Sequence, residues 1–393
     1  MTPLAPRLKA QIHTAAFYCA MFGALGAHLP FWPVWMEDWG LGPGEVGLFM
    51  GLGFVARVIA GLAVPVLADR AGARRQVLMG LCLAGAAVFA AHSIIGARWL
   101  LLLGTLVTGA ILSGMMPLGE TLGSGAAQRY GFGYAVPRAV GSVAFLLANL
   151  SVGALIGAYG ADMALWWIVV FLAVAAALAP GHPGAGTRGS DGLPPGFAEI
   201  GRMLTHPTFA LFTAAAALSL ASHGVYYLYG SIHWRSLGLG EALIGRLWAF
   251  SVAIEVVVML LLGEWLIRRL GPVGALTLSG VGGIGRWGLM ALDPLGPGLW
   301  ALQVTHTLTF VAGHLGAIAF IAQAVPGRFA ATAQGAFMGF GSGIFMALTM
   351  MLGAAVYPLA GGLTYLLAAA MSAAGLALSL ALARRWSGQK LAL

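Results

Sequence analysis

Charge is what this 393-residue chain has least of: charged residues make up 8% of it, and hydrophobic residues make up 60%. A soluble domain carries about 25% charged residues, because its surface has to face water. Cysteine is also rare, and the two cysteines, Cys19 and Cys82, have no paired spacing that would indicate a disulfide or a metal site. The scarcity of charge excludes a soluble globular fold and indicates that lipid surrounds most of the chain.

Other absences exclude further classes of protein. The sequence has no Walker-type phosphate loop, so we do not expect direct use of ATP. It has no His, Asp and Glu cluster with metal-ligand spacing and no activated Ser near an expected interface, so we expect no enzymatic activity, no cofactor and no metal. Short segments of alternating polarity are also missing, which argues against a membrane barrel of strands.

Long apolar runs dominate the chain instead. A helix needs about 20 apolar residues to cross about 30 Å of hydrocarbon, and the sequence offers twelve such runs. The predicted spans are 10–36, 44–68, 76–96, 99–122, 133–157, 163–180, 208–234, 242–265, 272–292, 298–323, 331–354 and 360–383. We therefore predict an all-α integral membrane protein with twelve transmembrane helices.

The positive residues indicate how these spans are oriented. Lys and Arg in short loops stay on the cytoplasmic side, and only Arg98 and Arg235 lie in the odd-numbered loops. We therefore expect a multi-pass protein of the cell (inner) membrane with both termini in the cytoplasm. Arg7 and Lys9 precede an apolar run too long for a signal peptide, which predicts a retained first helix. The net charge of +8 then reflects topology, and no nucleic-acid partner is expected.

The longest polar interruption divides the spans into two sets of six. It runs from Pro180 to Met203 and is rich in Gly and Pro, as is typical of a linker. We predict an N-terminal six-helix bundle over 1–180, a cytoplasmic linker over 181–206 and a C-terminal six-helix bundle over 207–393. The loops around Gly72 and Gly271 echo each other weakly, as parallel repeats would.

The loop between spans 2 and 3 carries a family resemblance. Its sequence, Asp69-Arg70-x-Gly72-x-Arg74-Arg75, resembles the signature loop of the major facilitator superfamily, although Pro65 stands where a Gly is usual. An ordinary positive-inside loop would explain Arg74 and Arg75 but not Asp69 or Gly72. The resemblance implies a secondary transporter of two pseudo-symmetric six-helix bundles that works by alternating access, with all five of these residues in a cytoplasmic gate.

A second set of motifs narrows the resemblance. The set comprises Leu29-Pro30-Phe31-Trp32-Pro33, Ala56-Arg57, Arg138-x-x-Gly141-Ser142, His223-Gly224-Val225-Tyr226-Tyr227, Leu247-Trp248-Ala249 with Glu255, Arg286-Trp287, and His306 with Thr309, Phe310 and His314. Together they resemble the phenylpropionate permease-type branch, which is related to the oligosaccharide and nucleoside proton symporters typified by lactose permease. The resemblance implies proton symport of a small molecule, and we expect a functional monomer. Thr309 stands where the sugar symporters place a proton-carrying Glu, which leaves the proton carrier open.

Charges inside apolar spans are the first candidates for function, since each costs several kcal/mol. Glu120 and Arg138 are 18 residues apart across a short loop, so antiparallel helices can bring them together. In the resembled symporters such a pair holds the substrate; the alternative is a structural ion pair. Arg57 has no carboxylate at i±4, so it either contacts substrate or has a partner on another helix.

Glu255, Arg286 and His306 are the predicted proton-coupling group, together with His314. Burial raises the pKa of a carboxylate and a nearby Arg lowers it, so a Glu whose Arg partner moves can load and release a proton. The spacing of 20 residues between Arg286 and His306 matches the lactose permease pattern. A static buried triad is the alternative.

Aromatic and His side chains complete the predicted substrate site. His28 and Trp32 lie beside two prolines, and His223, Tyr226 and Tyr227 share a helix face that could form a wall for a ring or could simply pack. Four arginines and two glutamates near or within spans leave excess positive charge, which favours an aromatic monocarboxylate similar to phenylpropionate. A sugar or nucleoside symporter, or a drug or lipid exporter, stays an alternative.

Overall fold

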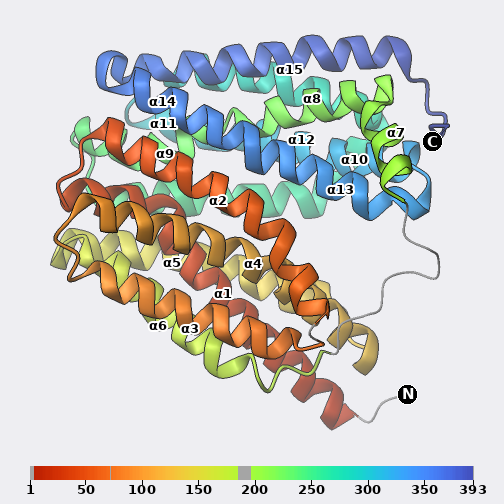
Figure 1. The fold of residues 1–393 in the computed structure, drawn as a ribbon. Coiled ribbons are helices and arrows are strands. Elements are labelled where there is room, and N and C mark those ends of the chain that lie inside the picture. The colour runs from red at the N-terminus through yellow and green to blue at the C-terminus, as the bar shows by residue number, and fades with distance from the viewer. Residues whose placement is uncertain (1–3, 71, 185–195, 393) are drawn as a thin grey trace. The chain divides into compact units, whose positions relative to one another are not determined.

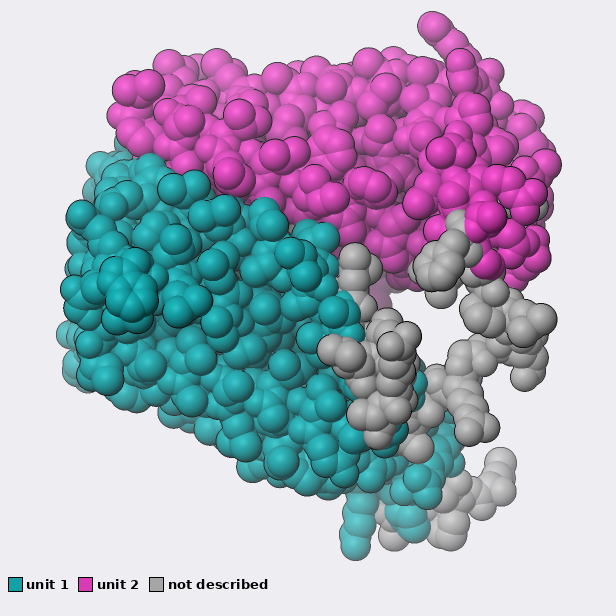
Figure 2. All heavy atoms as spheres, in the orientation of Figure 1, with its two compact units in different colours: residues 1–189, 234–249 teal, residues 190–233, 250–393 magenta. Residues whose placement is uncertain are grey.

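Helices account for all the regular structure of the residues that the computed structural model describes, which are 4–70, 72–184 and 196–392 (Figure 1). The chain forms two compact units (Figure 2). Unit 1 comprises residues 1–189 and 234–249, and unit 2 comprises residues 190–233 and 250–393. The all-α prediction is confirmed, whereas the predicted domain boundaries stay a prediction.

Unit 1 is built on six long helices that alternate in direction along the chain. They are α1 (Leu4–Asp38), α2 (Pro43–Arg70), α3 (Arg74–His92), α4 (Arg98–Tyr130), α5 (Ala135–Tyr159) and α6 (Asp162–Leu178). Helix α1 packs against α5 and α6, and α2 packs against α4. Glycine allows this close packing: a Cβ at Gly26 of α1 would lie 2.6 Å from the carbonyl oxygen of Phe145 in α5.

Unit 2 contains more broken helices. Its elements are α7 (Phe197–Thr205), α8 (Pro207–Ala221), α9 (Gly224–Ser236), α10 (Glu241–Met290), α11 (Pro297–Val304), α12 (Ala312–Ala324), α13 (Ala330–Met338), α14 (Met346–Ala360) and α15 (Tyr365–Arg385), with short 3₁₀ and π segments between the last five. The C-terminal end of α9 and the start of α10 belong to unit 1. Gly271, with φ 65° and ψ 175°, breaks α10 just before Pro272.

The lengths of these helices suit a membrane. In the described part of the chain, nine helical stretches are long and apolar enough to span a bilayer. Two of them, Glu241–Met290 with 50 residues and Thr332–Arg385 with 54, each cover two predicted spans, and the shorter Asp162–Leu178 covers the sixth. The chain is a multi-pass membrane protein, and the count of twelve spans stays a prediction.

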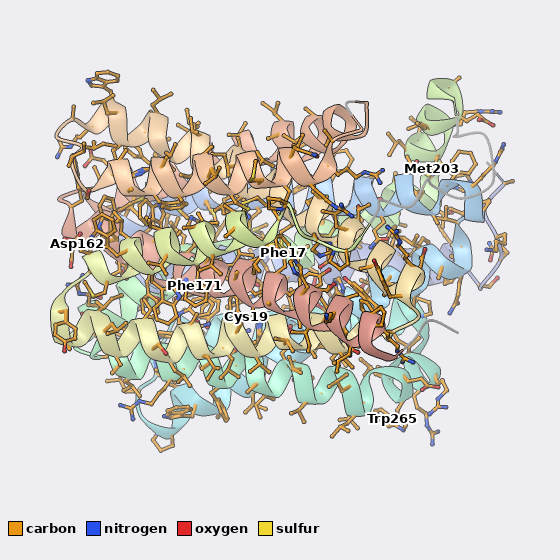
Figure 3. All side chains as sticks on the ribbon, turned by 90° about the horizontal axis from the view of Figure 1, so that it is seen from below. Phe17, Cys19, Asp162, Phe171, Met203 and Trp265 are labelled. Atoms are coloured by element: carbon orange, nitrogen blue, oxygen red, sulfur yellow. The ribbon has the colours of Figure 1, made fainter. Side chains whose placement is uncertain are left out.

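Large apolar side chains on the outside of the helices agree with a lipid environment. Leu260 and Leu261 of α10 are 77% and 74% exposed. Trp265 on the same helix is half exposed and projects away from the helices in Figure 3. Water would penalise an apolar surface of this extent, whereas hydrocarbon does not.

The first residues of the predicted linker are folded onto unit 1. Arg75, at the start of α3, donates from Nη2 and Nε to the carbonyl oxygen of Gly184 at 2.9 and 3.2 Å. The Gly184 N–H donates to Nδ1 of His182 at 3.1 Å. The His182 ring is fully buried and meets Phe17 edge-on at 5.4 Å between ring centroids. The signature loop and the start of the linker therefore hold each other.

The signature loop needs its glycine for the backbone. Gly72 has φ +61°, a left-handed conformation that side chains with a Cβ rarely adopt. Asp69 and Arg70 fall outside the residues whose side chains the structure describes. The gating role predicted for the loop therefore stays a prediction.

The end of the predicted linker is helical and packs onto unit 2. Helix α7 begins with a capping contact, in which Glu199 accepts the Gly196 N–H at 2.9 Å, and Glu199 also pairs with Arg328 at 3.0 Å. Met203, labelled in Figure 3, is fully buried in a core cluster that includes Phe209 and Trp386. The linker is therefore anchored at both of its ends.

Candidate functional site

A short π-helical segment interrupts the helix that carries His306, one of the predicted proton-coupling residues. The segment, Thr307–Val311, lies between α11 and α12 and follows His306 directly. Wider turns of this kind shift side chains around the helix axis and are frequent at functional sites. Here the segment places Thr309 beside His306 and next to Arg286 of α10.

The predicted proton-coupling residues come together in unit 2. Arg286 is 1% exposed, and its Nη1 donates to Nδ1 of His306 at 2.5 Å. A ring that accepts at Nδ1 carries its proton on Nε2 when neutral, and Nε2 lies 3.3 Å from Oε2 of Glu255. His306 thus bridges the guanidinium and the carboxylate. The structure brings these three residues together, and their role in coupling stays a prediction.

Arg286 has hydrogen-bond donors that the described residues leave without a partner. Its Nη1 also donates to Oγ1 of Thr309 at 3.2 Å, but Nε and Nη2 are buried without a hydrogen-bond partner among the described residues. The rings of Trp287 and Tyr226 lie 4.6 and 4.9 Å from the guanidinium carbon. Nε and Nη2 of one arginine point in parallel and match the two oxygens of a carboxylate. The guanidinium therefore has the paired donors that a carboxylate needs, flanked by two aromatic rings.

His223 and Tyr226 of the predicted aromatic wall border this group. His223 is fully buried. Its Nδ1 donates to the Leu220 carbonyl oxygen at 3.0 Å, and its Nε2 lies 3.0 Å from Oγ1 of Thr309. The Tyr226 hydroxyl donates to Oε1 of Gln303 at 3.1 Å. Tyr227 has its ring 5.7 Å from that of His223.

The remaining predicted member, His314, is connected through an aromatic stack. His306 stacks on Phe310 at 5.5 Å, and Phe310 stacks on His314 at 5.8 Å with nearly parallel rings. The sequence assigned no role to Gln303 and only a family departure to Thr309. Gln303 lies about one helical turn before His306, which is the one signal that could have marked it.

A second polar cluster lies in unit 1. Nε of Arg138 pairs with Oε1 of Glu120 at 3.1 Å, and the Tyr18 hydroxyl donates to Oε2 of Glu120 at 3.1 Å. The Tyr134 hydroxyl lies 3.0 Å from that of Tyr18, and the guanidinium of Arg138 covers the Phe22 ring at 4.2 Å. The predicted pair therefore forms, and both carboxylate oxygens already have partners.

Arg57 differs from Arg138. Its guanidinium lies over the Phe54 ring at 4.6 Å, and no described carboxylate lies within ion-pair distance of it. Ser113 of α4 donates to the Arg57 carbonyl oxygen at 2.6 Å and fixes the backbone. Arg57, like Arg286, is thus a cation that has no described carboxylate within ion-pair distance.

His28 and Trp32, both predicted to line the substrate site, belong to a packed aromatic column in unit 1. Trp32 is fully buried and stacks on Trp35 at 4.6 Å with an interplanar angle of 5°. His28 stacks on the other side at 6.1 Å, and Phe89 meets Trp32 edge-on at 4.9 Å. The column gives these residues a packing role, and their predicted contact with substrate stays a prediction.

A helical multi-pass architecture with charged residues inside its apolar helices, buried in unit 2 and half-buried in unit 1, is typical of membrane transporters. Residues 11–368 match the model of the MFS_1 like family. The chain belongs to this family of the major facilitator superfamily, whose members are transporters and not enzymes. The recognition of the superfamily from the signature loop is confirmed.

Similarity to individual proteins agrees with the family. The chain is 29% identical over 310 residues to the "Probable 3-phenylpropionic acid transporter" of Escherichia coli (strain K12), covering 78% of this chain and 80% of the relative. It is 26% identical over 343 residues to the "Maltose permease" of Geobacillus stearothermophilus, covering 84% and 83%.

Solved structures share the fold. A mutant of the nucleoside transporter NupG aligns with a TM-score of 0.84 at 16% identity, covering 96% of this chain and 100% of that one. A bacterial homologue of the human lysosomal transporter Spinster aligns with a TM-score of 0.71 at 17% identity, covering 98% and 99%. At this identity the likeness concerns the fold alone, and it confirms the predicted major facilitator fold.

Proposed function

We propose that the protein is a proton-coupled symporter that imports a small aromatic monocarboxylate, similar to phenylpropionate, by alternating access. It would act as a monomer in the cell's inner membrane, with both termini in the cytoplasm. The observation that carries the proposal is that two N–H groups of the buried Arg286, Nε and Nη2, have no hydrogen-bond partner among the described residues, in a guanidinium that lies against Tyr226 and Trp287. The similarity to the Escherichia coli relative, a probable 3-phenylpropionic acid transporter, supports the same class of substrate.

The charge balance favours an anion as the substrate. Arg138 already has Glu120, whereas neither Arg286 nor Arg57 has a described carboxylate within ion-pair distance. A buried cation without a counter-ion is expensive, and a bound carboxylate would lower that cost through charge-assisted hydrogen bonds. The aromatic rings around Arg286 would contact the apolar ring of the same substrate.

Coupling to protons would follow from repulsion between two carboxylates. Glu255 reaches Arg286 through His306, so a substrate carboxylate on Arg286 would place a second negative charge close to Glu255. Two neighbouring carboxylates resist ionising together, and one of them takes a proton. Substrate binding would therefore promote protonation of Glu255. Release of either ligand would weaken the binding of the other.

A competition-binding experiment at low salt tests the substrate class. The probes are 3-phenylpropionate and its amide, measured on the wild-type protein and on Arg286→Gln. The acid should bind at least about tenfold more tightly, which corresponds to about 1.4 kcal/mol for a charge-assisted pair. Arg286→Gln should remove the difference. Arg57→Gln is the matched variant: loss of the acid preference there and not in Arg286→Gln would move the carboxylate site to unit 1.

Equal binding of acid and amide by the wild type would overturn the anion assignment. A second candidate, a sugar or nucleoside symporter, then takes its place. It is favoured by the Glu120–Arg138 pair with the hydroxyl of Tyr18, since a carboxylate beside an arginine also suits neighbouring substrate hydroxyls. Tight binding of a disaccharide or a nucleoside that fails in Glu120→Gln would support this candidate.

The gate assigned to Asp69, Arg70, Gly72, Arg74 and Arg75 completes the proposal. The contact of Arg75 with Gly184 supports it, because the loop then holds the start of the linker. Charge-assisted contacts of this kind can form in one conformation and break in the other.

A further inference from the structure

One hydroxyl in the π-helical segment contacts three members of the polar group in unit 2. Thr309 is 3% exposed; its Oγ1 accepts from Nη1 of Arg286 at 3.2 Å and donates to the carbonyl oxygen of His306 at 3.1 Å. Nε2 of His223 lies 3.0 Å from the same oxygen. The Thr309 hydroxyl is therefore central to the group around Arg286, although the mechanism proposed above gives it no role.

The backbone of Thr309 is held independently of its side chain. Ser279 of α10 donates to the Thr309 carbonyl oxygen at 2.6 Å, and the Ser279 hydroxyl lies 2.6 Å from that of Ser219 in α8. Carbonyl groups in a π-helical turn depart from the regular helical pattern, so side chains of neighbouring helices can satisfy them. A substitution at 309 would therefore change the chemistry beside Arg286 and keep these backbone contacts.

The acceptors that hold Nη1 of Arg286 are both neutral. They are Oγ1 of Thr309 and Nδ1 of His306, which has to be unprotonated in order to accept. Neutral acceptors fix the direction of a guanidinium without compensating its charge, whereas a carboxylate at the same distance would compensate it. Nε and Nη2 have no partner among the residues that the structure describes. The contacts of Arg286 thus orient its guanidinium and leave its positive charge uncompensated.

A carboxylate at position 309 would change this balance. The oxygens of an Asp side chain there would extend about one bond beyond the position of Oγ1, which is already 3.2 Å from Nη1 of Arg286. The guanidinium would then have a counter-ion within the protein. A substrate carboxylate would have to displace that counter-ion or lie next to a second negative charge, and both are unfavourable.

We propose that Thr309 is a specificity-determining residue: its neutral hydroxyl positions the Arg286 guanidinium without cancelling its charge, so that the site selects a carboxylate over a neutral molecule of the same shape. The inference rests on the proposed function, in which the substrate carboxylate pairs with Arg286. Thr309 acts through Arg286 and needs no contact of its own with the substrate.

Two variants of similar shape and different charge test the inference. Thr309→Asp and Thr309→Asn are compared with the wild type in equilibrium binding of 3-phenylpropionate and of its amide, at low salt and neutral pH. The wild type and Thr309→Asn should bind the acid at least about tenfold more tightly than the amide. Thr309→Asp should bind the two ligands within about twofold of each other, because the added carboxylate neutralises Arg286.

A second pair of variants tests the positioning by the hydroxyl. Val has nearly the shape of Thr but cannot accept from Nη1 of Arg286, whereas Ser keeps the hydroxyl. Thr309→Val should weaken binding of the acid by about two- to tenfold, as expected for one lost hydrogen bond, and should leave binding of the amide unchanged. Thr309→Ser should bind the acid as the wild type does. A side chain that only packs would affect acid and amide equally.

The outcomes separate this inference from the proposed function. Equal binding of acid and amide by the wild type overturns the anion assignment and the inference with it. An acid preference that Arg286→Gln keeps moves the carboxylate site elsewhere and also overturns the inference. An acid preference that Arg286→Gln removes and Thr309→Asp keeps overturns the role of Thr309 alone.

Melting temperatures show whether each variant is folded. If Thr309→Asp does not fold, the Val and Ser variants decide the matter. Equal weakening of acid and amide in Thr309→Val, or failure of Thr309→Ser to restore binding of the acid, then overturns the inference.

Discussion

Acidification should destabilise the protein through the buried His182. Nδ1 of His182 accepts the N–H of Gly184, so a proton on that nitrogen would break this contact, which helps to position Gly184 for its hydrogen bonds with Arg75 of the signature loop. Burial, together with the positive charges of His13 and Arg75, lowers the pKa of His182 to about 3. An unfolded histidine has a pKa of about 6.5.

The sign and size of the effect follow from these two pKa values. Below about pH 6.5 the unfolded chain binds a proton at His182 that the folded chain excludes, so stability falls as the pH falls from about 6.5 towards about 3. No effect of this residue is expected above pH 6.5, where both states are neutral. At about pH 5 the pH lies about 1.5 units below the pKa of His182 in the unfolded chain. The free energy of unfolding is then lower by about 2 kcal/mol.

Unfolding of the purified protein in detergent provides the assay. The free energy of unfolding, or the melting temperature, is measured at about pH 7.5 and about pH 5 for the wild type and His182→Asn. Asn offers a side-chain oxygen to the Gly184 N–H but does not titrate. The wild type should lose about 2 kcal/mol more than the variant on acidification. An equal loss in both proteins would refute the assignment of this pH dependence to His182.

Two further predictions concern coupling and packing. Glu255→Gln should abolish uphill accumulation but retain exchange of preloaded substrate, because a permanently neutral side chain still lets the loaded carrier move; normal uphill uptake would exclude Glu255 and turn attention to Glu120, His306 or His314. Gly245→Val should lower stability by about 1–3 kcal/mol, because overpacking forces the helices apart and a Cβ there would lie 2.3 Å from the Asn149 carbonyl oxygen. Gly288→Val on the same helix α10 meets open space and is the matched control; equal losses in melting temperature would contradict the packing argument.

Charge was the part of the sequence from which contacts could be predicted. A charged side chain in an apolar helix requires a partner, and residues at similar distances from a short loop meet across antiparallel helices. This reasoning places Glu120 with Arg138, and the resemblance to the lactose permease pattern places Arg286 with His306, as the structure has them. The lengths of the apolar runs predicted the helical fold. A chain in hydrocarbon has to satisfy its backbone hydrogen bonds internally, and an α-helix does so within one segment.

Contacts between distant polar groups near the helix ends could not be predicted in this way. His233 of α9 contacts Asp293 in the loop after α10 and Tyr357 in α14, and these contacts depend on the left-handed conformation of Asp293 and on the glycine at 362. The contact of Arg75 with Gly184 depends on how the chain turns after α6. No periodic pattern records such geometry, because each case is decided by one backbone conformation.

Anchoring of the linker at both ends sets a limit on the reach of the chain. Gly184 is held by Arg75 in unit 1, and α7 begins at Phe197 with its Met203 in the core of unit 2. A fully extended chain spans at most about 3.5 Å per residue, so the stretch between these anchors can bridge no more than about 45 Å. A tether of 26 residues, the length predicted from the sequence, would have allowed about twice that distance. Any cycle that keeps both anchors must therefore move the two attachment points within this shorter radius, and cutting the chain between them would remove the limit while leaving both anchors in place.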